Sequence, residues 1–439
     1  MEDKKTILMI ANSDTGANGF LSFVERLKDR NDIRFVMVCH PRVQIRAVKE
    51  KSRNLGNASF KVLDFDKRER QRGKALVNRD YKYVKDRLYV AAYTAAFNTV
   101  KIVTQNRQGL RRAKIMMKNE KPDAVLLYAD NKSELEKFFI YCAKRQRIPT
   151  IVAPICMSDI EGILLNPSNG FRQKKTDKLP ITARIVKRIN PRLEREYGDQ
   201  VVFFSQPFRE ILERLMGFGV PNPWVQGSLA DIVCTAYQEQ YDETVKELGE
   251  ESAKGRLFLT ESVEDGIIIE GYENRESVRN ALAQKYGLHQ KETVVIAFSE
   301  RVQQWSKEND LYNKGVIVRS VLESFDEVLV SLHPKSDPDE NRFLEDFKGC
   351  HIVEEPLRQI IGAADLIVYA DISSIFRWVD WLHISKVTFR SYSMQEKWTD
   401  DMIAEFQVKV EDAKKAGTVK RAYEPERGID FAKFVLDRI

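Results

Sequence analysis

The sequence predicts an α/β protein of two domains, each built on a parallel β-sheet covered by helices. Apolar runs of strand length alternate with amphipathic helical segments along most of the 439 residues. The alternation restarts after a polar, acidic stretch at 237–254, and the chain is too long for one ordinary domain. Apolar residues make up 43% of the chain and charged residues 31%, a balance typical of a folded protein with buried cores.

In the first half, each apolar run that predicts a strand is followed by a polar loop. These runs lie at 6–10, 33–38, 123–128, 149–154 and 201–204. A helix is expected after the first run, where Phe20, Phe23 and Leu27 recur at helical spacing, and another around 134–144. Such βαβ units form a parallel sheet with right-handed crossovers.

The second half repeats this architecture without a visible sequence repeat. Its strands are expected at 256–260, 294–298, 327–332, 351–353, 366–371 and 386–389, with a helix at 276–286. We therefore expect domains at 1–236 and 255–394, followed by a charged helical tail at 395–439 that packs back on the first domain. Two such domains are expected to face each other across a cleft.

Several classes of protein are excluded by composition. The longest apolar runs have strand length and the N-terminus lacks a signal-peptide pattern, so we expect a cytoplasmic protein. The cysteines are dispersed and odd in number, and we expect buried, reduced thiols rather than disulfides or a zinc site. No pair of the five histidines has metal-ligand spacing, so neither a metal nor another cofactor is expected. The cysteines are Cys39, Cys142, Cys156, Cys234 and Cys350.

The net charge of +6 conceals two strongly basic stretches, at 67–121 and at 172–195. Solvated helix faces explain such runs as well as attraction to a polyanion or an anionic membrane surface does. No nucleic-acid recognition motif accompanies them, and nucleic acid is not an expected partner.

The strongest functional signal is a pair of serines behind an apolar strand. Ser373 and Ser374 follow the run that ends at Asp371, and Ile375, Val379 and Leu382 behind them share one helical face. Ser373 and Ser374 are therefore expected at or beside the helix N-cap, where hydroxyls and backbone N–H groups favour an anion. Ordinary helix capping is the alternative explanation.

A second signal ends the strand at 327–332. His333, Pro334 and Lys335 follow it directly, although a Pro also simply stops a strand. Because ligands of open α/β sheets gather at the carboxyl ends of strands, the sequence predicts a phosphate clamp that these residues share with Ser373 and Ser374. We expect the two strand ends to be neighbours.

These motifs resemble those of the GT-B transferases that build bacterial envelope and capsule polysaccharides. The CDP-glycerol glycerophosphotransferases and the CMP-sialic acid or CMP-Kdo transferases share a His-Pro and a later Ser-Ser, here His333-Pro334 and Ser373-Ser374. The resemblance covers roughly 200–390. It implies a GT-B fold of two Rossmann-like domains, with the acceptor on the first and the nucleotide donor on the second.

The resemblance implies a metal-independent inverting glycosyltransferase, or a polyol-phosphate transferase, that uses a CMP- or CDP-linked donor. His333 would contact the donor phosphate and assist departure of the nucleotide. The expected acceptor is a polyanionic or lipid-linked glycan, held by the basic segments at the inner face of the membrane. The donor-binding residues expected are His333, Pro334, Lys335, Asp371, Ser373, Ser374 and Arg301.

The base that deprotonates the acceptor hydroxyl is expected among carboxylates near strand ends. Asp14 is preferred because Gly16 and Gly19 in its loop allow close approach of a substrate, although Asp14 also suits a helix cap. Glu264-Asp265-Gly266 matches the acidic-acidic-Gly motif of some sialyltransferases and makes Asp265 a second candidate, or it is a turn. The residues expected to bind the acceptor are His40, Asp130, Asp159 and Glu161.

Two alternatives remain open. One is a UDP-sugar transferase or an enzyme like the UDP-GlcNAc 2-epimerases, which have the same fold but carry a Glu pair where this chain has Phe376-Arg377-Trp378. The other is a non-catalytic scaffold with a degenerate GT-B fold, which would bind no nucleotide.

Overall fold

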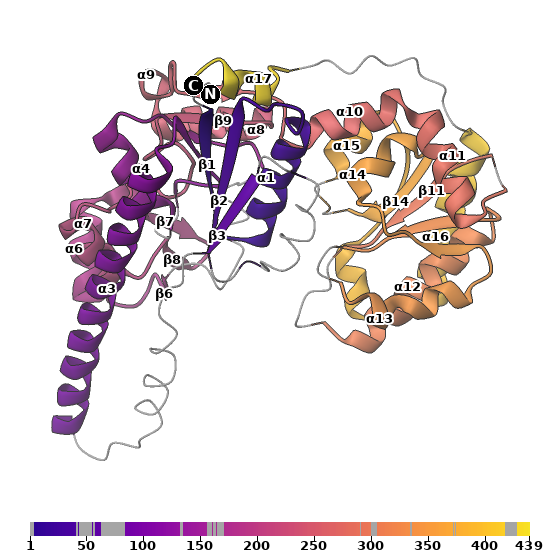
Figure 1. Cartoon of the computed structure of the whole chain (residues 1–439). Helices are drawn as coiled ribbons and strands as arrows, with labels where there is room; N and C mark the ends of the chain where they lie inside the picture. The colour runs from indigo at the N-terminus through magenta and orange to yellow at the C-terminus, as the bar shows by residue number, and fades with distance from the viewer. Residues whose placement is uncertain are drawn as a thin grey trace. The chain divides into compact units, whose positions relative to one another are not determined.

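The computed structural model describes residues 4–40, 43, 55, 58–62, 84–131, 135–155, 160, 164, 171–289, 291–299, 305–333, 336–371, 373, 375–417 and 428–439. The chain folds as two compact units (Figure 1). The first unit comprises Met1–Val263 and Gly428–Ile439, and the second comprises Glu264–Arg427. Both chain ends belong to the first unit.

The first unit contains a seven-stranded parallel sheet in the order β10-β9-β5-β4-β1-β2-β3. The inner strand β1 is buried from Thr6 to Ala11 because helices cover both of its faces. The strands are β1 (Lys5–Ala11), β2 (Ile33–Cys39), β3 (Ala58–Val62), β4 (Ala124–Leu127), β5 (Thr150–Val152), β9 (Ile232–Thr235) and β10 (Leu257–Leu259).

Alternate residues of β1 separate the two cores of this unit. Ile7 and Met9 pack with α1 (Asp14–Arg26) and α17 (Phe431–Leu436), whereas Leu8 and Ile10 pack on the other face. The helices on that other face are α3 (Val84–Glu120), α4 (Glu136–Gln146), α8 (Gln238–Leu248) and α9 (Glu250–Ala253).

Three sequence predictions for the first unit are wrong in detail. The run at 201–204 forms β8 (Gln200–Phe203) of a separate antiparallel sheet, between β6 (Phe171–Lys174) and β7 (Glu194–Tyr197). The stretch at 237–254, which was expected to lie between the two domains, forms α8 and α9 of the first unit. The run at 256–260, expected in the second domain, forms β10, which pairs with β9 at the edge of the first sheet.

Two short helices pack against the antiparallel sheet. They are α6 (Ile181–Ile189) and α7 (Pro207–Leu215), separated in sequence by the 3-10 turn η2 (Pro191–Leu193). Ala183 and Val186 of α6 join Val201 and Phe203 in a small core. This core fixes one face of α6 to the unit.

The second unit contains a five-stranded parallel sheet in the order β13-β12-β11-β14-β15. One face packs with α12 (Lys307–Leu322) and α16 (Asp400–Ala416). The strands are β11 (Val294–Ala297), β12 (Val328–Ser331), β13 (Cys350–Ile352), β14 (Leu366–Ala370) and β15 (Ser385–Phe389). The other face packs with α10 (Asp265–Glu273), α11 (Arg275–Tyr286), α14 (Leu357–Ile360) and α15 (Phe376–Trp381). Short turns join these elements at α13 (Pro338–Asn341), η3 (Arg342–Asp346), η4 (Ile361–Ala363) and η5 (Ser391–Gln395).

The C-terminal tail divides between the two units, contrary to the prediction for 395–439. Helix α16 packs on α12 and β15 of the second unit. Only the last twelve residues return to the first unit, where the Phe431 ring lies 5.5 Å from the Phe23 ring and Asp430 pairs with Arg26 at 2.5 Å. Apolar burial by α17 thus completes the core beside α1.

None of the helices described is both long and apolar enough to cross a membrane. The four thiols within the described ranges, Cys39, Cys142, Cys234 and Cys350, are free and buried, which confirms the predicted burial. Cys156 lies outside these residues. Burial, with a smaller contribution from Asp14, raises the pKa of Cys39 to about 12. Burial, with Glu345, raises that of Cys350 to about 12 as well.

Burial of these thiols makes the free energy of unfolding depend on pH in the alkaline range. A thiol of the unfolded chain has a pKa of about 8.5, whereas the pKa values of Cys39 and Cys350 in the folded protein are about 12. Their contribution to stability is therefore complete below the unfolded pKa and is lost as the pH rises through the folded pKa. In a Cys156→Ser background, we expect no labelling by a thiol reagent at pH 8 until urea unfolds the protein. Rapid labelling of the native protein would contradict the burial.

Candidate functional site

The sheet of the second unit has its topological switch point between β11 and β14. From the central β11 the chain adds β12 and β13 on one side and then β14 and β15 on the other. Ala297 is in register with both Ser331 of β12 and Tyr369 of β14, so the three strands end level with one another. The loops that follow these strands form the candidate site, since ligands of open α/β sheets bind at this edge.

His333 stands at this edge, two residues beyond β12. It is half-buried, and its carbonyl accepts a hydrogen bond from the Ser336 N–H at 2.8 Å, which forms a turn after the strand. Pro334 and Lys335 lie outside the described residues. The prediction that the strand ends carrying His333 and Ser373 are neighbours is wrong, because β11 lies between β12 and β14. Two strand spacings separate these ends by about 10 Å.

Ser373 lies in a tight turn between β14 and α15. Its N–H donates to the Ala370 carbonyl at 2.9 Å, and its own carbonyl accepts from Phe376 N–H at 3.2 Å. The N-cap of α15 is Ile375, so Ser373 does not cap the helix itself but lies beside the cap, two residues earlier in the chain. Ser374 and Ile372 are not among the described residues.

The predicted apolar face behind the serines is confirmed, because Ile375, Val379 and Leu382 are buried. Asp371, an expected donor-binding residue, is exposed and also makes a structural contact. Its carboxylate accepts from the Ser391 N–H at 2.9 Å and ties the end of β14 to the turn after β15.

Asp265, a candidate base, is the first residue of α10 and is completely buried. Its two carboxylate oxygens accept from the Arg377 guanidinium at 3.0 and 2.7 Å. The adjacent Glu264 pairs with Arg358 at 3.3 Å. The acidic-acidic-Gly motif therefore fastens α10 to the helices behind the sheet, and a buried, paired carboxylate cannot reach an acceptor hydroxyl.

The first unit has its own switch point, between β1 and β4. Asp14 is half-buried at the first position of α1, and the Ser13 hydroxyl, rather than Asp14, caps the helix by accepting from Gly16 N–H at 3.1 Å. The two glycines expected in this loop lie in α1, where they allow close packing. A Cβ on Gly16 would lie 3.0 Å from the Tyr128 ring, and one on Gly19 would lie 2.6 Å from Ile155.

Of the other residues expected to bind the acceptor, the structure describes His40 and Asp130. His40 is half-buried after β2, and its N–H donates to the Ala11 carbonyl at 2.8 Å. Asp159 and Glu161 lie outside the described residues, as does Arg301 of the donor set.

Asp130, after β4, is completely buried and cannot contact an acceptor. Its carboxylate accepts from the backbone N–H groups of Gly227, Leu229 and Ala230 at 2.7–2.8 Å and thus holds the loop before β9. Burial raises the pKa of Asp130, while the three N–H groups oppose that rise. The predicted role in acceptor binding is replaced by a structural one.

Sequence reasoning overlooked Asn131. Its side chain is 1% exposed, and neither its amide nitrogen nor its amide oxygen has a hydrogen-bond partner among the described residues. Such a group is costly to bury, so it needs an explanation. Its position in the loop after β4, next to Asp130, was the available signal.

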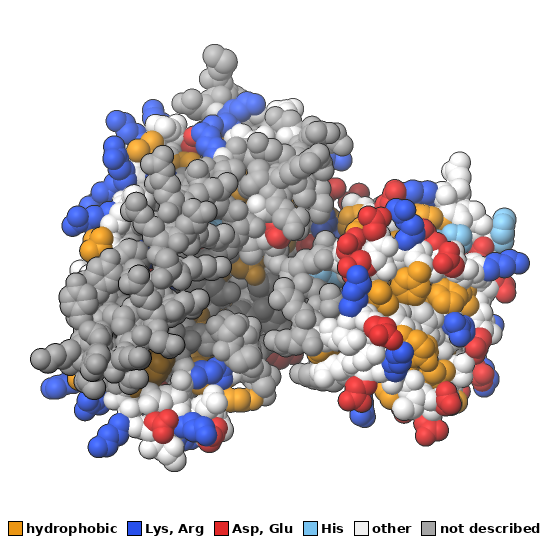
Figure 2. Space-filling model, turned by 90° about the horizontal axis from the view of Figure 1, so that it is seen from below, with side chains coloured by type: hydrophobic (Ala, Val, Ile, Leu, Met, Phe, Trp, Pro, Cys, Tyr) orange, Lys and Arg blue, Asp and Glu red, His pale blue; other side chains and the backbone are white. Residues whose placement is uncertain are grey.

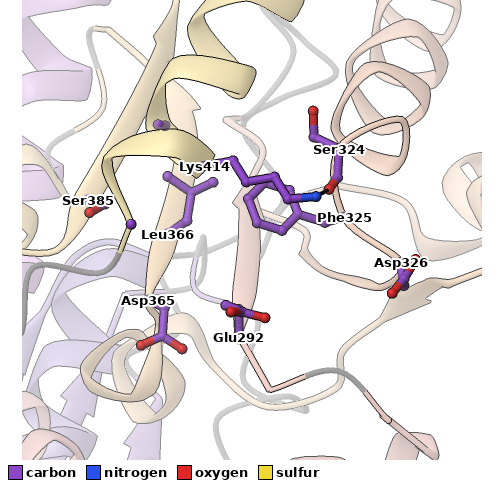
Figure 3. Close-up of a pocket in the computed structure, with 10 residues that line it drawn as sticks. Glu292, Ser324, Phe325, Asp326, Asp365, Leu366, Ser385 and Lys414 are labelled. Carbon is purple, nitrogen blue, oxygen red and sulfur yellow. Dashed lines mark hydrogen bonds between the residues drawn. The ribbon is translucent and has the colours of Figure 1, made fainter.

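A cavity of about 180 Å³ lies at the opposite, amino edge of the second unit's sheet (Figure 3). It is lined by Glu292, Asp326 and Asp365, which precede or begin strands, and by Lys414 of α16. The Lys414 ammonium lies 5.3 Å from the Phe325 ring and donates to the Ser324 carbonyl. Because this cavity is at the wrong end of the strands, it does not belong to the candidate site. Within the described ranges, no three His, Cys, Asp or Glu side chains are grouped to hold a metal ion.

No known family profile and no curated protein matches the sequence. Solved structures do match the fold over nearly the whole chain. The UDP-GlcNAc 2-epimerase of Neisseria meningitidis, bound to UDP-GlcNAc, aligns with a TM-score of 0.50 at 12% identity, over 98% of each chain. MnaA of S. aureus, in a co-structure with UDP, aligns with a TM-score of 0.50 at 12% identity, over 99% of this chain and 98% of its own. The chain therefore has a GT-B-like fold of two Rossmann-like α/β domains.

Proposed function

We propose that the protein is an enzyme acting on a nucleotide-linked sugar, whose phosphates bind at the carboxyl edge of the second unit's sheet. The proposal rests on the switch point between β11 and β14, which brings the loops after β11, β12 and β14 to one edge. Among solved structures with this fold are enzymes that hold UDP-GlcNAc or UDP, which supports a UDP-linked substrate.

In this proposal His333 and the Ser373 hydroxyl contact the phosphates from the two sides of β11. The strand spacing separates these residues by about two strand widths, which suits a diphosphate better than a single phosphate. Donor contacts from Lys335, Ser374 and Arg301 stay predictions, as does Asp14 as a base.

A cytidine-linked donor is the second candidate, and one observation favours it. This chain carries His333-Pro334 and Ser373-Ser374, the motifs that resemble those of the CMP- and CDP-dependent transferases. It also has Phe376-Arg377-Trp378 at the position where the epimerases are expected to carry a Glu pair.

Thermal unfolding with UDP, CDP, CMP and GDP tests the binding proposal. A nucleotide at 100 times its Kd adds about 2.7 kcal/mol to the free energy of unfolding, so the binding nucleotide raises Tm clearly. We expect UDP to give the largest shift and the His333→Ala variant to lose it.

The control is His289→Ala, an identical substitution at an exposed residue before β11, on the amino edge of the same sheet. This variant should respond to UDP like the unaltered protein. Stabilisation by CDP or CMP alone would replace UDP with a cytidine donor. If no nucleotide raised Tm, the enzyme proposal would fail in favour of the scaffold.

The reaction type is tested separately by product analysis. Incubation with UDP-GlcNAc alone yields the C2-epimeric sugar if the enzyme is an epimerase, since no acceptor is needed. A transferase leaves the sugar unchanged until an acceptor is added. Because C2 epimers have the same mass, proton NMR of the first mixture detects epimerisation, and mass spectrometry of the second mixture detects transfer to the acceptor.

A further inference from the structure

Helix α6 carries an exposed apolar stripe that the proposed function does not use. Ile181, Ile185 and Ile189 are 68%, 42% and 54% exposed, and their spacing of four residues places them along one side of the helix. The opposite side is anchored, because Ala183 and Val186 are buried against the antiparallel sheet. The stripe is thus a fixed surface feature of a folded helix.

Cationic side chains border this stripe. Arg184 and Arg188 are exposed on the same side of the helix as the isoleucines, and the described residues place no acidic partner against either one. Lys187 forms an ion pair with Glu194 at 2.6 Å. Helix α6 itself contains no acidic residue. Figure 2 shows Lys and Arg side chains, with hydrophobic ones between them, along the side of the first unit that carries α3, α6 and α7.

We propose that α6 docks the protein on an anionic lipid bilayer. The helix would lie in the plane of the interface, with its isoleucines among the acyl chains and its arginines on the lipid phosphates. An apolar side with cationic borders is the pattern of interfacial helices, and charge complementarity selects an anionic surface. A neutral protein partner would leave Arg184 and Arg188 without counter-charges.

Co-sedimentation of the full chain with vesicles tests this proposal. One set of vesicles is phosphatidylcholine alone, and the other contains a substantial share of phosphatidylglycerol. We expect binding to the anionic vesicles and at least about tenfold weaker binding to the neutral ones. The Ile181→Ser/Ile185→Ser variant should bind anionic vesicles at least about tenfold more weakly, since it loses two inserted side chains. Arg184→Gln/Arg188→Gln should lose the preference for anionic lipid.

The matched control is Val408→Ser on α16, because Val408 is 57% exposed and carries no part of the stripe. It should bind vesicles as the unaltered chain does, and circular dichroism should show all variants folded. Absence of vesicle binding, or binding that ignores the isoleucine substitutions, would overturn the proposal. A dimer in solution that the isoleucine variant converts to a monomer would instead assign the stripe to a second copy of the chain.

Discussion

Replacement of Asp130 with Ala is expected to lower the free energy of unfolding by about 3–5 kcal/mol. One carboxylate oxygen accepts from Gly227 N–H, and the other accepts from the N–H groups of Leu229 and Ala230. Ala removes both acceptors and leaves three backbone donors without partners at a completely buried position. Urea unfolding, followed by circular dichroism, measures the loss.

The control is Asp199→Ala, because the Asp199 side chain is exposed. A surface substitution of this kind changes stability by less than about 0.5 kcal/mol. Asp130→Asn keeps the volume and a single oxygen, so an intermediate loss is expected. A loss below about 1 kcal/mol in Asp130→Ala would show that the carboxylate does not hold the loop.

The Arg377→Met variant is expected to lose about 3–5 kcal/mol of stability, because it removes a cation that pairs with the buried Asp265 carboxylate. Asp265 is 0% exposed, and Arg377 donates to both of its oxygens. In the double variant Asp265→Asn/Arg377→Met no charge is buried, so much of the loss should be recovered. Chemical unfolding of the single and double variants forms the required cycle.

An exposed ion pair of the same residue types provides the comparison. Arg342 and Asp339 are 3.0 Å apart, but their side chains are 74% and 81% exposed. Arg342→Met is therefore expected to cost no more than about 1 kcal/mol. Equal losses in Arg342→Met and Arg377→Met would contradict the role assigned to burial. If Asp265→Asn abolished activity without altering stability, Asp265 would be a catalytic base after all.

The fold was predictable where the strands are strongly apolar. The runs that became β1, β2, β4, β11 and β14 each bury nearly every residue, and a continuous apolar run carries that information locally. Strand β3 escaped prediction because Ala58–Val62 is a mixed sequence at the sheet edge.

Membership of a sheet was harder to predict than the strands themselves. The residues of β8 and β10 were identified as strands, but an apolar run does not say which partner it will pair with. Pairing is decided by contacts between distant segments, so both strands were assigned to the wrong sheet.

The candidate site shows a similar division. The sequence placed His333 and Ser373 after strands of the second sheet, and the structure brings both strand ends to one edge. The sequence did not show that Asp130 and Asp265 are buried. The groups that donate hydrogen bonds to them, in the loop at 227–230 and on Arg377, are about a hundred residues away in the chain.

The return of α17 to the first unit makes that unit discontinuous in sequence, with the second unit inserted into it. During synthesis the inserted unit is complete once residue 427 has emerged, whereas the core beside α1 still lacks Phe431 and Phe434 at that point. The first unit therefore begins to be synthesised before the second unit but completes its core after it. A nascent chain that stops short of α17 would expose Phe23 and its neighbours to chaperones or to aggregation.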